Sequence, residues 1–306
     1  MTLKKSAKRF AALLLLAVTV IAVTACNTSQ YAESGNIIIP AKDLQTYIGM
    51  DNVVIVDMQA EEDYAVSHVE GAVNIPVSEI MISVPVQNML TSKSKLQKLL
   101  SANGIGNDAV MVVYDDNNMS ASRLFWTMLM YQNHNVLVVD GGLNAIKAAG
   151  YVLTAAVPEI TPAEYVAADK DEIWVAAMAD VQNQVNEPDK NVILLDVHTD
   201  AEYYQNGKVP SSVMFDYYDN FYSDGTFKSI ETTRIDYLKA GIKTENEIIV
   251  YCQTSMRAAA VFLRLYDAGY RNLRIYDGAY LEWSSNPSNP VDIPSGIAAP
   301  TNKDAS

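Results

Sequence analysis

The chain has 306 residues, of which 49% are apolar, and its formal net charge is −14 at neutral pH. This length and apolar content allow two domains of ordinary size, each with its own core. The excess of carboxylates argues against nucleic acid as a partner and against broad adhesion to anionic lipid. A site for a small anion must therefore be made positive locally, by backbone N–H groups and a few basic side chains.

The N-terminus has the pattern of a bacterial export signal. A basic start precedes an apolar stretch over residues 10–23 that is short for a bilayer span. The step Thr24-Ala25-Cys26 then resembles the lipobox of bacterial lipoproteins, in which the cysteine is lipidated and becomes the mature N-terminus. We expect a signal peptide over residues 1–25 and an acyl anchor such as palmitate on Cys26. The protein would then be exported and anchored to a membrane of the cell envelope, with a mature charge of −18 once the four basic residues of the signal are removed.

The rest of the chain contains an internal duplication. The segment NVVIVDMQAEEDY (residues 52–64) has a counterpart in NVILLDVHTDAEY (residues 191–203), and in each copy an apolar run ends in an aspartate, Asp57 or Asp196. Further on, VVYD and VVDGG in the first copy correspond to IVYC and IYDGA in the second. We expect the two repeated aspartates to have a shared structural role in fixing the loops at the strand ends.

Short β-branched runs alternate with helical patterns, most clearly over residues 120–133 and 257–269. This alternation predicts an α/β fold in which each copy is a mainly parallel sheet with helices on both faces. Composition places the first domain at 38–155, a linker at 156–175, the second domain at 176–296 and a disordered tail at 297–306.

Cys252 ends the apolar run EIIVYC and begins the loop CQTSMR, which leads into the second helical pattern. With Cys26 assigned to the anchor, it is the one thiol left in the mature chain. Many free cysteines are simply small buried hydrophobes. At a strand-to-helix turn, however, converging N–H groups and the helix N-terminus stabilise a thiolate, and Arg257 can add a formal charge. The position therefore favours a reactive thiol.

The mature chain resembles the rhodanese family of sulfurtransferases in its tandem two-domain form. The resemblance rests on several segments in order: SHVEGAVNIPV and VVDGGLNAI in the first copy, and DVHTDAEYYQNGKVPSSV, DGTFKS, YCQTSMRAA and YDGAYLEWSSNPSNPV in the second. It implies two rhodanese-like domains, of which the first is inactive because Asp115 stands at the position of the nucleophile.

The resemblance also implies a mechanism. The Cys252 thiolate would take the outer sulfur of thiosulfate or 3-mercaptopyruvate as a persulfide, and cyanide or a thiol would then remove it, without metal or organic cofactor. The implied substrate-binding residues are Gln253, Thr254, Ser255, Met256, Arg257 and His198. The implied partners are therefore the small sulfur donor and acceptor, together with the membrane through the lipid.

The implied site departs from the common family pattern at three positions, two of them in the loop that begins at Cys252. Gln253 stands where arginine is common, Ser255 where glycine is common, and His198 where an anion-binding arginine is often found. Glycine tolerates positive φ and close backbone approach, so Ser255 bears on the fine geometry of the loop. A histidine with an unperturbed pKa is mostly uncharged near neutral pH, which would weaken anion binding.

Two alternative functions remain open. A phosphatase or arsenate-reductase-like enzyme could use the same fold, but phosphatases have five residues between Cys and Arg, whereas Cys252 and Arg257 enclose four. A non-catalytic binding lipoprotein could keep the fold without turnover. His68 and His134 lack metal-ligand spacing and are expected to be surface or packing residues. The aromatic cluster at residues 215–225 is expected to pack its loop onto the second domain.

Overall fold

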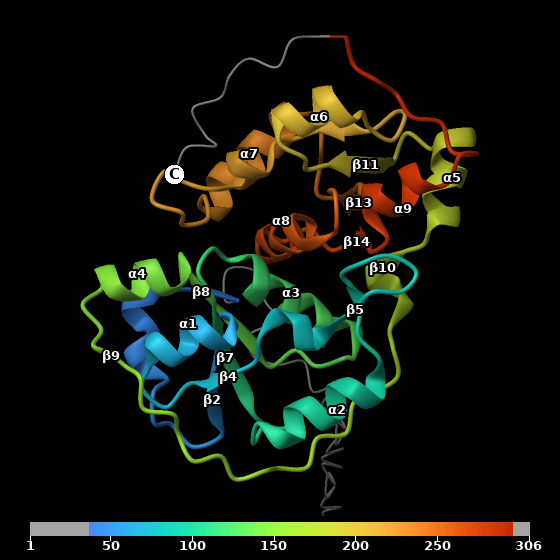
Figure 1. Ribbon diagram of the computed structural model, residues 1–306. Helices are drawn as coiled ribbons and strands as arrows, with labels where there is room; N and C mark the ends of the chain where they lie inside the picture. The colour runs from blue at the N-terminus through green and yellow to red at the C-terminus, as the bar shows by residue number, and fades with distance from the viewer. Residues whose placement is uncertain (1–36, 296–306) are drawn as a thin grey trace, which may run out of the picture.

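The computed structural model describes residues 37–295, so the predicted signal peptide, the predicted lipidation at Cys26 and the predicted tail at 297–306 lie outside the described part. Two five-stranded parallel sheets form the two halves of the molecule (Figure 1). Within the described residues no helix is long and apolar enough to cross a membrane.

The first sheet has the order β1-β8-β7-β2-β4, and all of its neighbouring strands pair in parallel. Its helices and strands are β1 (Ile38–Pro40), β2 (Val53–Asp57), α1 (Glu61–Val66), β4 (Val73–Asn74), α2 (Lys93–Ala102), β7 (Val110–Tyr114), α3 (Met119–Met130), β8 (Val136–Asp140) and α4 (Gly142–Ala148). Two short antiparallel pairs flank it: β3 (His68–Val69) with β9 (Leu153–Thr154), and β5 (Met81–Ile82) with β6 (Met89–Leu90).

The second sheet repeats this arrangement with the order β10-β14-β13-β11-β12, again all parallel. Its elements are β10 (Val175–Ala176), α5 (Met178–Asn186), β11 (Val192–Asp196), α6 (Asp200–Asn206), β12 (Val213–Met214), α7 (Ile230–Lys239), β13 (Glu247–Tyr251), α8 (Met256–Asp267), β14 (Leu273–Tyr276) and α9 (Ala279–Ser285). The prediction of two parallel α/β units with helices on both faces is confirmed.

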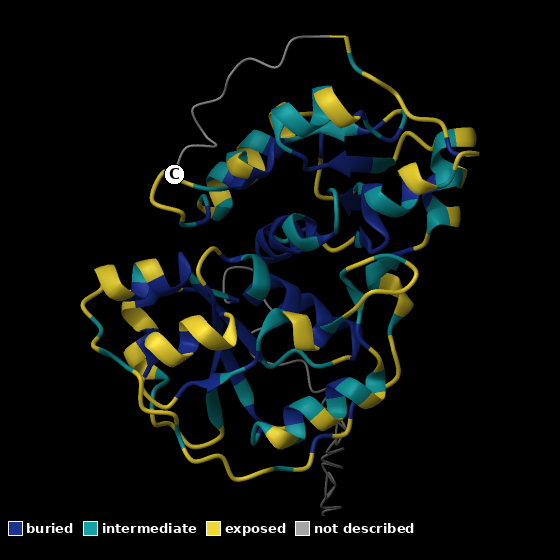
Figure 2. Ribbon diagram, in the orientation of Figure 1, coloured by how far each residue is buried: buried dark blue, intermediate teal, exposed yellow. Residues whose placement is uncertain are grey.

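The helices α3 and α8 pack against each other between the two sheets (Figure 1). Nearly every residue of both helices is buried, as Figure 2 shows. The ring of Phe125 on α3 meets that of Tyr266 on α8 edge to face, with 5.6 Å between centroids. Helices with apolar side chains over most of their surface are buried on most sides, so the two sequence patterns reflect the contact between the domains.

The other faces of the sheets are covered separately. In the first domain α4 and the 3-10 turn Ala41–Thr46 cover the face away from α3, around Leu44, Leu143 and Ile146. In the second domain α5 and α9 cover the face away from α8, around Val181 and Trp283. The carboxyl ends of the strands in each sheet therefore open on one edge, which is where ligands bind in folds of this kind.

The segment between the domains is attached along the first domain. Ser101 accepts hydrogen bonds from the backbone N–H groups of Ala163 (3.0 Å) and Tyr165 (3.0 Å). Val166 and the amide of Asn107 bind each other at 2.9 and 2.8 Å. With Tyr165 also buried, this segment is held against the first domain.

The two repeated aspartates fix the strand ends, as predicted. Asp57 accepts from the N–H of Gln59 at 2.8 Å, and Asp196 accepts from the N–H of His198 at 3.0 Å. Asp196 also accepts from the hydroxyl of Tyr251 at 2.7 Å. Both carboxylates are fully buried, so each ties the end of its strand to the next loop.

Candidate active site around Cys252

Cys252 directly follows β13 and lies at the carboxyl edge of the second sheet. It is 1% exposed, and it is the one cysteine of the described residues, without a disulfide partner. Its carbonyl oxygen accepts from the N–H of Tyr280 at 2.9 Å, and the next carbonyl, of Gln253, accepts from Leu281 at 3.1 Å. The start of α9 therefore holds the N-terminal side of the loop.

In the first domain, the loop that corresponds to the Cys252 loop binds a carboxylate. The carboxylate of Asp115, at the position of Cys252, accepts three backbone hydrogen bonds: from Asn118 at 2.7 Å, from Ser120 at 2.6 Å and from Ala121 at 3.3 Å. Burial raises the pKa of Asp115 to about 6, although these three donors act in the opposite direction. The loop is thus an anion cradle that is filled by its own side chain.

The second loop has the same backbone. Asn118 has φ 66° and ψ −2°, and Ser255, its counterpart, has φ 62° and ψ −5°. The N–H of Leu143 binds the carbonyl of Asp115 at 2.7 Å, as Tyr280 binds that of Cys252. From this correspondence we infer that the N–H groups of Ser255, Arg257 and Ala258, the counterparts of the three donors to Asp115, face the thiol. Such a cradle stabilises a thiolate or a sulfur anion bound to it.

Replacing Asp115 with alanine should therefore affect the stability of the first loop without affecting the chemistry of the second. The change leaves three N–H groups without an acceptor, two of them buried and one partly buried, at a cost of about 2 kcal/mol, or roughly 5 °C in melting temperature. The sulfur transfer that the family resemblance implies should stay within about twofold of wild type, because Cys252 is unchanged. Calorimetry and a thiosulfate–cyanide assay on the same samples check this. A large loss of turnover in protein that is still folded would give Asp115 a role in the reaction.

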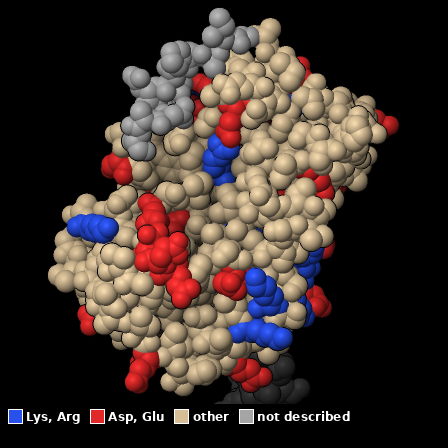
Figure 3. Space-filling model, viewed as in Figure 1, with Lys and Arg blue, Asp and Glu red and all other residues tan. Residues whose placement is uncertain are grey.

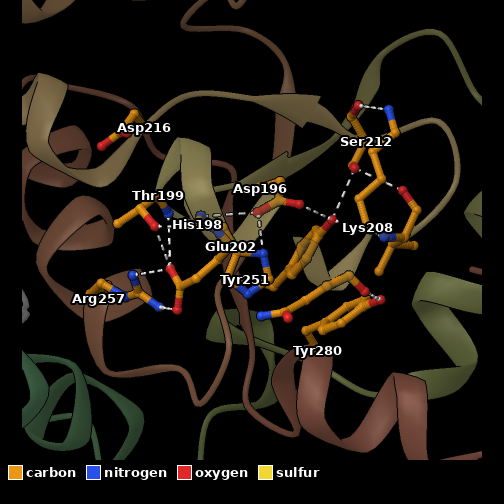
Figure 4. Close-up of polar contacts among 12 residues, drawn as sticks. Asp196, His198, Thr199, Glu202, Lys208, Ser212, Asp216, Tyr251, Arg257 and Tyr280 are labelled. Atoms are coloured by element: carbon orange, nitrogen blue, oxygen red, sulfur yellow. Dashed lines mark hydrogen bonds and ion pairs between the residues drawn. The ribbon is translucent and has the colours of Figure 1, made fainter. Parts of the chain in front are cut away.

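Arg257 occupies the first turn of α8 and forms a bidentate ion pair with Glu202 of α6, with N–O distances of 2.5 and 2.7 Å (Figure 4). Burial alone would raise the pKa of Glu202, but Arg257 and the N–H of Thr199 hold it at about 2. Burial would lower the pKa of Arg257, but its hydrogen bond to Glu202 and the charge of Cys252 raise it instead. Both groups stay charged, so Glu202 neutralises part of the cation beside the thiol.

Glu202 has no place in the expected set of site residues, although the sequence carries a local signal for it. Thr199-x-x-Glu202 is a capping box, in which each side chain binds the backbone N–H of the other residue. This places Glu202 on the first turn of α6. The contact with Arg257, 55 residues further along, comes from the packing of the second domain.

His198 lies at the end of β11 with its ring fully buried. Its Nδ1 is 2.9 Å from Oδ1 of Asp196, and its ring meets those of Tyr251 and Tyr280 edge to face. The expectation that it contacts the donor stays a prediction, because a small anion could reach this ring only if the surrounding side chains moved.

The structure brings the remaining predicted residues together in one loop. Ser255 is fully buried, whereas Gln253, Thr254 and Met256 are partly exposed. The side-chain oxygen of Gln253 is buried and has no hydrogen-bond partner. It cannot supply the positive charge that an arginine would at this position, so the charge at the site comes from Arg257 and the backbone N–H groups.

The cluster at residues 215–225 packs onto the second domain, as expected. Phe215 stacks on Tyr237 at 4.2 Å and Phe221 on Phe227 at 4.7 Å. Tyr217 is buried, and burial followed by the charge of Asp115 raises its pKa; the charges of Arg257 and Cys252 also act on it. Its hydroxyl therefore stays protonated close to the candidate site.

The corresponding edge of the first domain is strongly acidic. A cavity of about 540 Å³ beside Asp115 is lined by Glu61, Glu62, Asp63, Glu79 and Asp116, and carboxylates gather over α1 on this face of the molecule (Figure 3). Ser120 takes the place of Arg257 there. This edge would repel an anionic donor. Within residues 37–295 no group of three or more His, Cys, Asp or Glu side chains is arranged to hold a metal ion.

The fold and site define a tandem α/β protein in which one copy presents a strand-end cysteine to an N–H cradle and the other fills the same cradle with a carboxylate. The sequence pattern described as Rhodanese-like domain matches the chain twice, over residues 40–149 and 177–286. The chain therefore belongs to the rhodanese-like family.

Several curated relatives span most of the chain. A Haloferax volcanii protein named "Putative thiosulfate sulfurtransferase" is 28% identical over 256 residues, which cover 78% of this chain and 88% of the relative. The "Thiosulfate sulfurtransferase" of Corynebacterium glutamicum is 26% identical, with coverage of 83% and 90%. The "Sulfur carrier protein TtuD" of Thermus thermophilus is 28% identical, with coverage of 76% and 89%. These relatives support a sulfurtransferase.

Among solved structures, an EanB variant in complex with ergothioneine superposes with a TM-score of 0.77 at 18% identity, covering 87% of this chain and 72% of that chain. The anaerobic ergothioneine biosynthesis enzyme of Chlorobium limicola gives 0.73 at 20% identity, with coverage of 83% and 69%. At these identities the likeness shows the shared fold.

Proposed function

We propose that this protein moves a sulfane sulfur from a small anionic donor to a thiophilic acceptor through a persulfide on Cys252. The observation that carries the proposal is the loop around Cys252, which matches the anion cradle seen at Asp115. Thiosulfate is the first donor to test, since relatives are named thiosulfate sulfurtransferases; 3-mercaptopyruvate is the second.

The reaction divides into two displacements. The Cys252 thiolate attacks the outer sulfur of thiosulfate, the S–S bond of the donor breaks, and sulfite leaves with the bonding electron pair. The terminal sulfur of the persulfide carries the negative charge, which the N–H groups of Ser255, Arg257 and Ala258 stabilise. Cyanide or a thiolate then attacks this sulfur, and the Cys252 thiolate is restored.

The loop length fits a small group. Cys252 and Arg257 enclose four residues, and α8 already begins at Met256. The donor would approach from the exposed side of the loop, where Arg257 retains some exposure. We further propose that the protein works outside the cytoplasm, held to a membrane by a lipid on Cys26, as the N-terminal sequence suggests.

Intact-protein mass spectrometry tests this function directly. Purified protein incubated with thiosulfate should gain one sulfur atom, about 32 Da, and cyanide should remove it with release of thiocyanate. The gain should persist in Cys26→Ser and disappear in Cys252→Ser. If neither thiosulfate nor 3-mercaptopyruvate gives an adduct, a phosphatase-like or non-catalytic binding role would replace sulfur transfer as the working hypothesis.

A further inference from the structure

A buried arginine of the first domain reaches the Cys252 loop of the second. Arg123 lies on α3 and its side chain is fully buried. Its Nη1 donates to Oγ of Ser255 at 3.1 Å, and its Nη2 donates to Oδ1 of Asp277 at 2.7 Å and to the carbonyl of Asn88 at 2.7 Å. The guanidinium also lies 4.4 Å from the ring centre of Trp126.

Ser255 is the contact that matters most for the thiol. It is the last residue before α8, and its backbone has the left-handed conformation that turns the loop into the helix. Its N–H is one of the three expected to face Cys252. Its hydroxyl also lies 3.3 Å from Oδ1 of Asp277. A shift of this side chain would therefore move a donor of the cradle.

Asp277 extends the same contact to the other side of the loop. It follows β14 and stands three residues before Tyr280, whose N–H holds the carbonyl of Cys252. Its second oxygen accepts from the N–H of Leu90, in the first domain, at 2.7 Å. Arg123 and the N–H of Leu90, both in the first domain, thus bind Asp277 at the start of the turn that leads to Tyr280.

This arrangement explains why serine occupies a position that favours glycine. A left-handed conformation strains any residue with a Cβ, and glycine would adopt it freely. The serine hydroxyl offsets that strain because it gives Nη1 of Arg123 an acceptor inside the protein, where an unpaired donor is costly. One of the three residues that depart from the family pattern, Ser255, is thus the one that accepts a hydrogen bond from the other domain.

We propose that Arg123 is a positioning residue for the Cys252 loop, so that the catalytically silent domain completes the active site through Ser255 and Asp277. The proposal rests on Cys252 being the nucleophile of the proposed function. It gives the first domain a role in the reaction, although its own loop carries Asp115.

The chain supplies a matched control. Asp140 is the counterpart of Asp277 in the first domain, and it accepts an interdomain hydrogen bond from the N–H of Phe227 at 2.8 Å. It has no hydrogen bond to the loop over residues 252–257. Asp140→Ala should therefore weaken the contact between the domains while leaving the cradle in place.

The test compares Ser255→Gly, Arg123→Ala and Asp140→Ala with wild type. Two rates are measured: the rate of persulfide formation from thiosulfate, and the rate at which iodoacetamide alkylates Cys252 at a series of pH values. Ser255→Gly removes the hydroxyl and suits the backbone, so the loop loses its link without added strain. We expect both Ser255→Gly and Arg123→Ala to slow persulfide formation about tenfold and to shift alkylation to higher pH. Asp140→Ala should stay within about twofold of wild type.

Both changes break the hydrogen bond between Arg123 and Ser255, so their effects should not add. The rate of persulfide formation in the double variant Arg123→Ala/Ser255→Gly should therefore lie within about twofold of the rate in each single variant. Normal rates in folded Arg123→Ala and Ser255→Gly would overturn the proposal, and so would an equal loss in Asp140→Ala. If Arg123→Ala does not fold, Ser255→Gly alone decides. The alkylation assay needs no sulfur donor, so it tests the positioning even if wild type forms no persulfide.

Discussion

Replacing Cys252 with serine is expected to reduce sulfur transfer by at least about 10³-fold, because a hydroxyl in this cradle is a far weaker nucleophile than a thiolate and cannot form a persulfide. The fold should be kept. Serine is slightly smaller than cysteine, and its oxygen can accept from the N–H groups that converge on position 252. Thiocyanate formation from thiosulfate and cyanide measures the loss, and a thermal melt checks the fold.

Cys26→Ser is the control for this result. It removes the other thiol of the sequence, so its sulfur transfer should equal that of wild type in the same detergent or buffer. Residual transfer in Cys252→Ser that exceeded about 1% of wild type would place the reacting sulfur elsewhere and would remove the basis of the mechanism.

The second large effect is expected at Arg257. Its replacement with alanine removes a cation beside the thiol and leaves Glu202 half buried and unpaired. We expect kcat/KM for thiosulfate to fall about 100-fold, since the dianionic donor then meets a bare carboxylate. The melting temperature should fall by only a few degrees, because the pair is partly exposed.

The variant Glu202→Gln distinguishes the effect of the Glu202 charge from its role in holding Arg257 in place. It keeps a side chain of similar shape and leaves the charge of Arg257 without a counter-ion, so thiosulfate use should equal or exceed that of wild type. The double variant Arg257→Ala/Glu202→Gln should recover part of the loss seen in Arg257→Ala. If Glu202→Gln instead reduced transfer as much as Arg257→Ala, the pair would act by holding the loop rather than by its charge.

The pH dependence of these variants has a definite sign. In wild type, Arg257 holds the pKa of Glu202 at about 2, below its ordinary value of 4.5. The stabilising effect of the pair is therefore complete above about pH 4.5 and is lost as the pH falls towards 2. Without Arg257 the pKa of Glu202 loses the largest of the effects that lower it and is higher than in wild type, so the carboxylate is protonated more easily and the defect of Arg257→Ala should become smaller as the pH falls.

Much of the fold could be read from local patterns. The repeated runs around Asp57 and Asp196 became the matching strands β2 and β11, and the two apolar helical patterns became α3 and α8. The aspartates fix the strand ends because a buried carboxylate needs donors nearby, and the following backbone supplies them. These features depend on contacts between near neighbours in sequence, which leave a visible periodicity.

Of the candidate site, local sequence patterns predicted only the loop that carries Cys252 and Arg257. Cys252 and Arg257 belong to one short loop, and their spacing is fixed by the start of a helix. The partners that define the charge and position of that loop come from distant segments: Glu202 is 55 residues from Arg257, and Arg123 is 132 residues from Ser255. No local pattern relates residues at such separations.

The duplication, the parallel α/β class and the position of one cysteine at a strand end in front of a helix all follow from local sequence patterns, because periodicity and chain connectivity dictate them. The contacts that local sequence patterns do not reveal are the ion pair of Glu202 with Arg257, the burial of the His198 ring, and the hydrogen bond from Arg123 of the first domain to Ser255. Each of these contacts joins segments that are far apart in the chain and that meet only when the apolar faces of the helices and sheets are removed from water. The His198 ring, for example, is covered by Tyr251 and Tyr280.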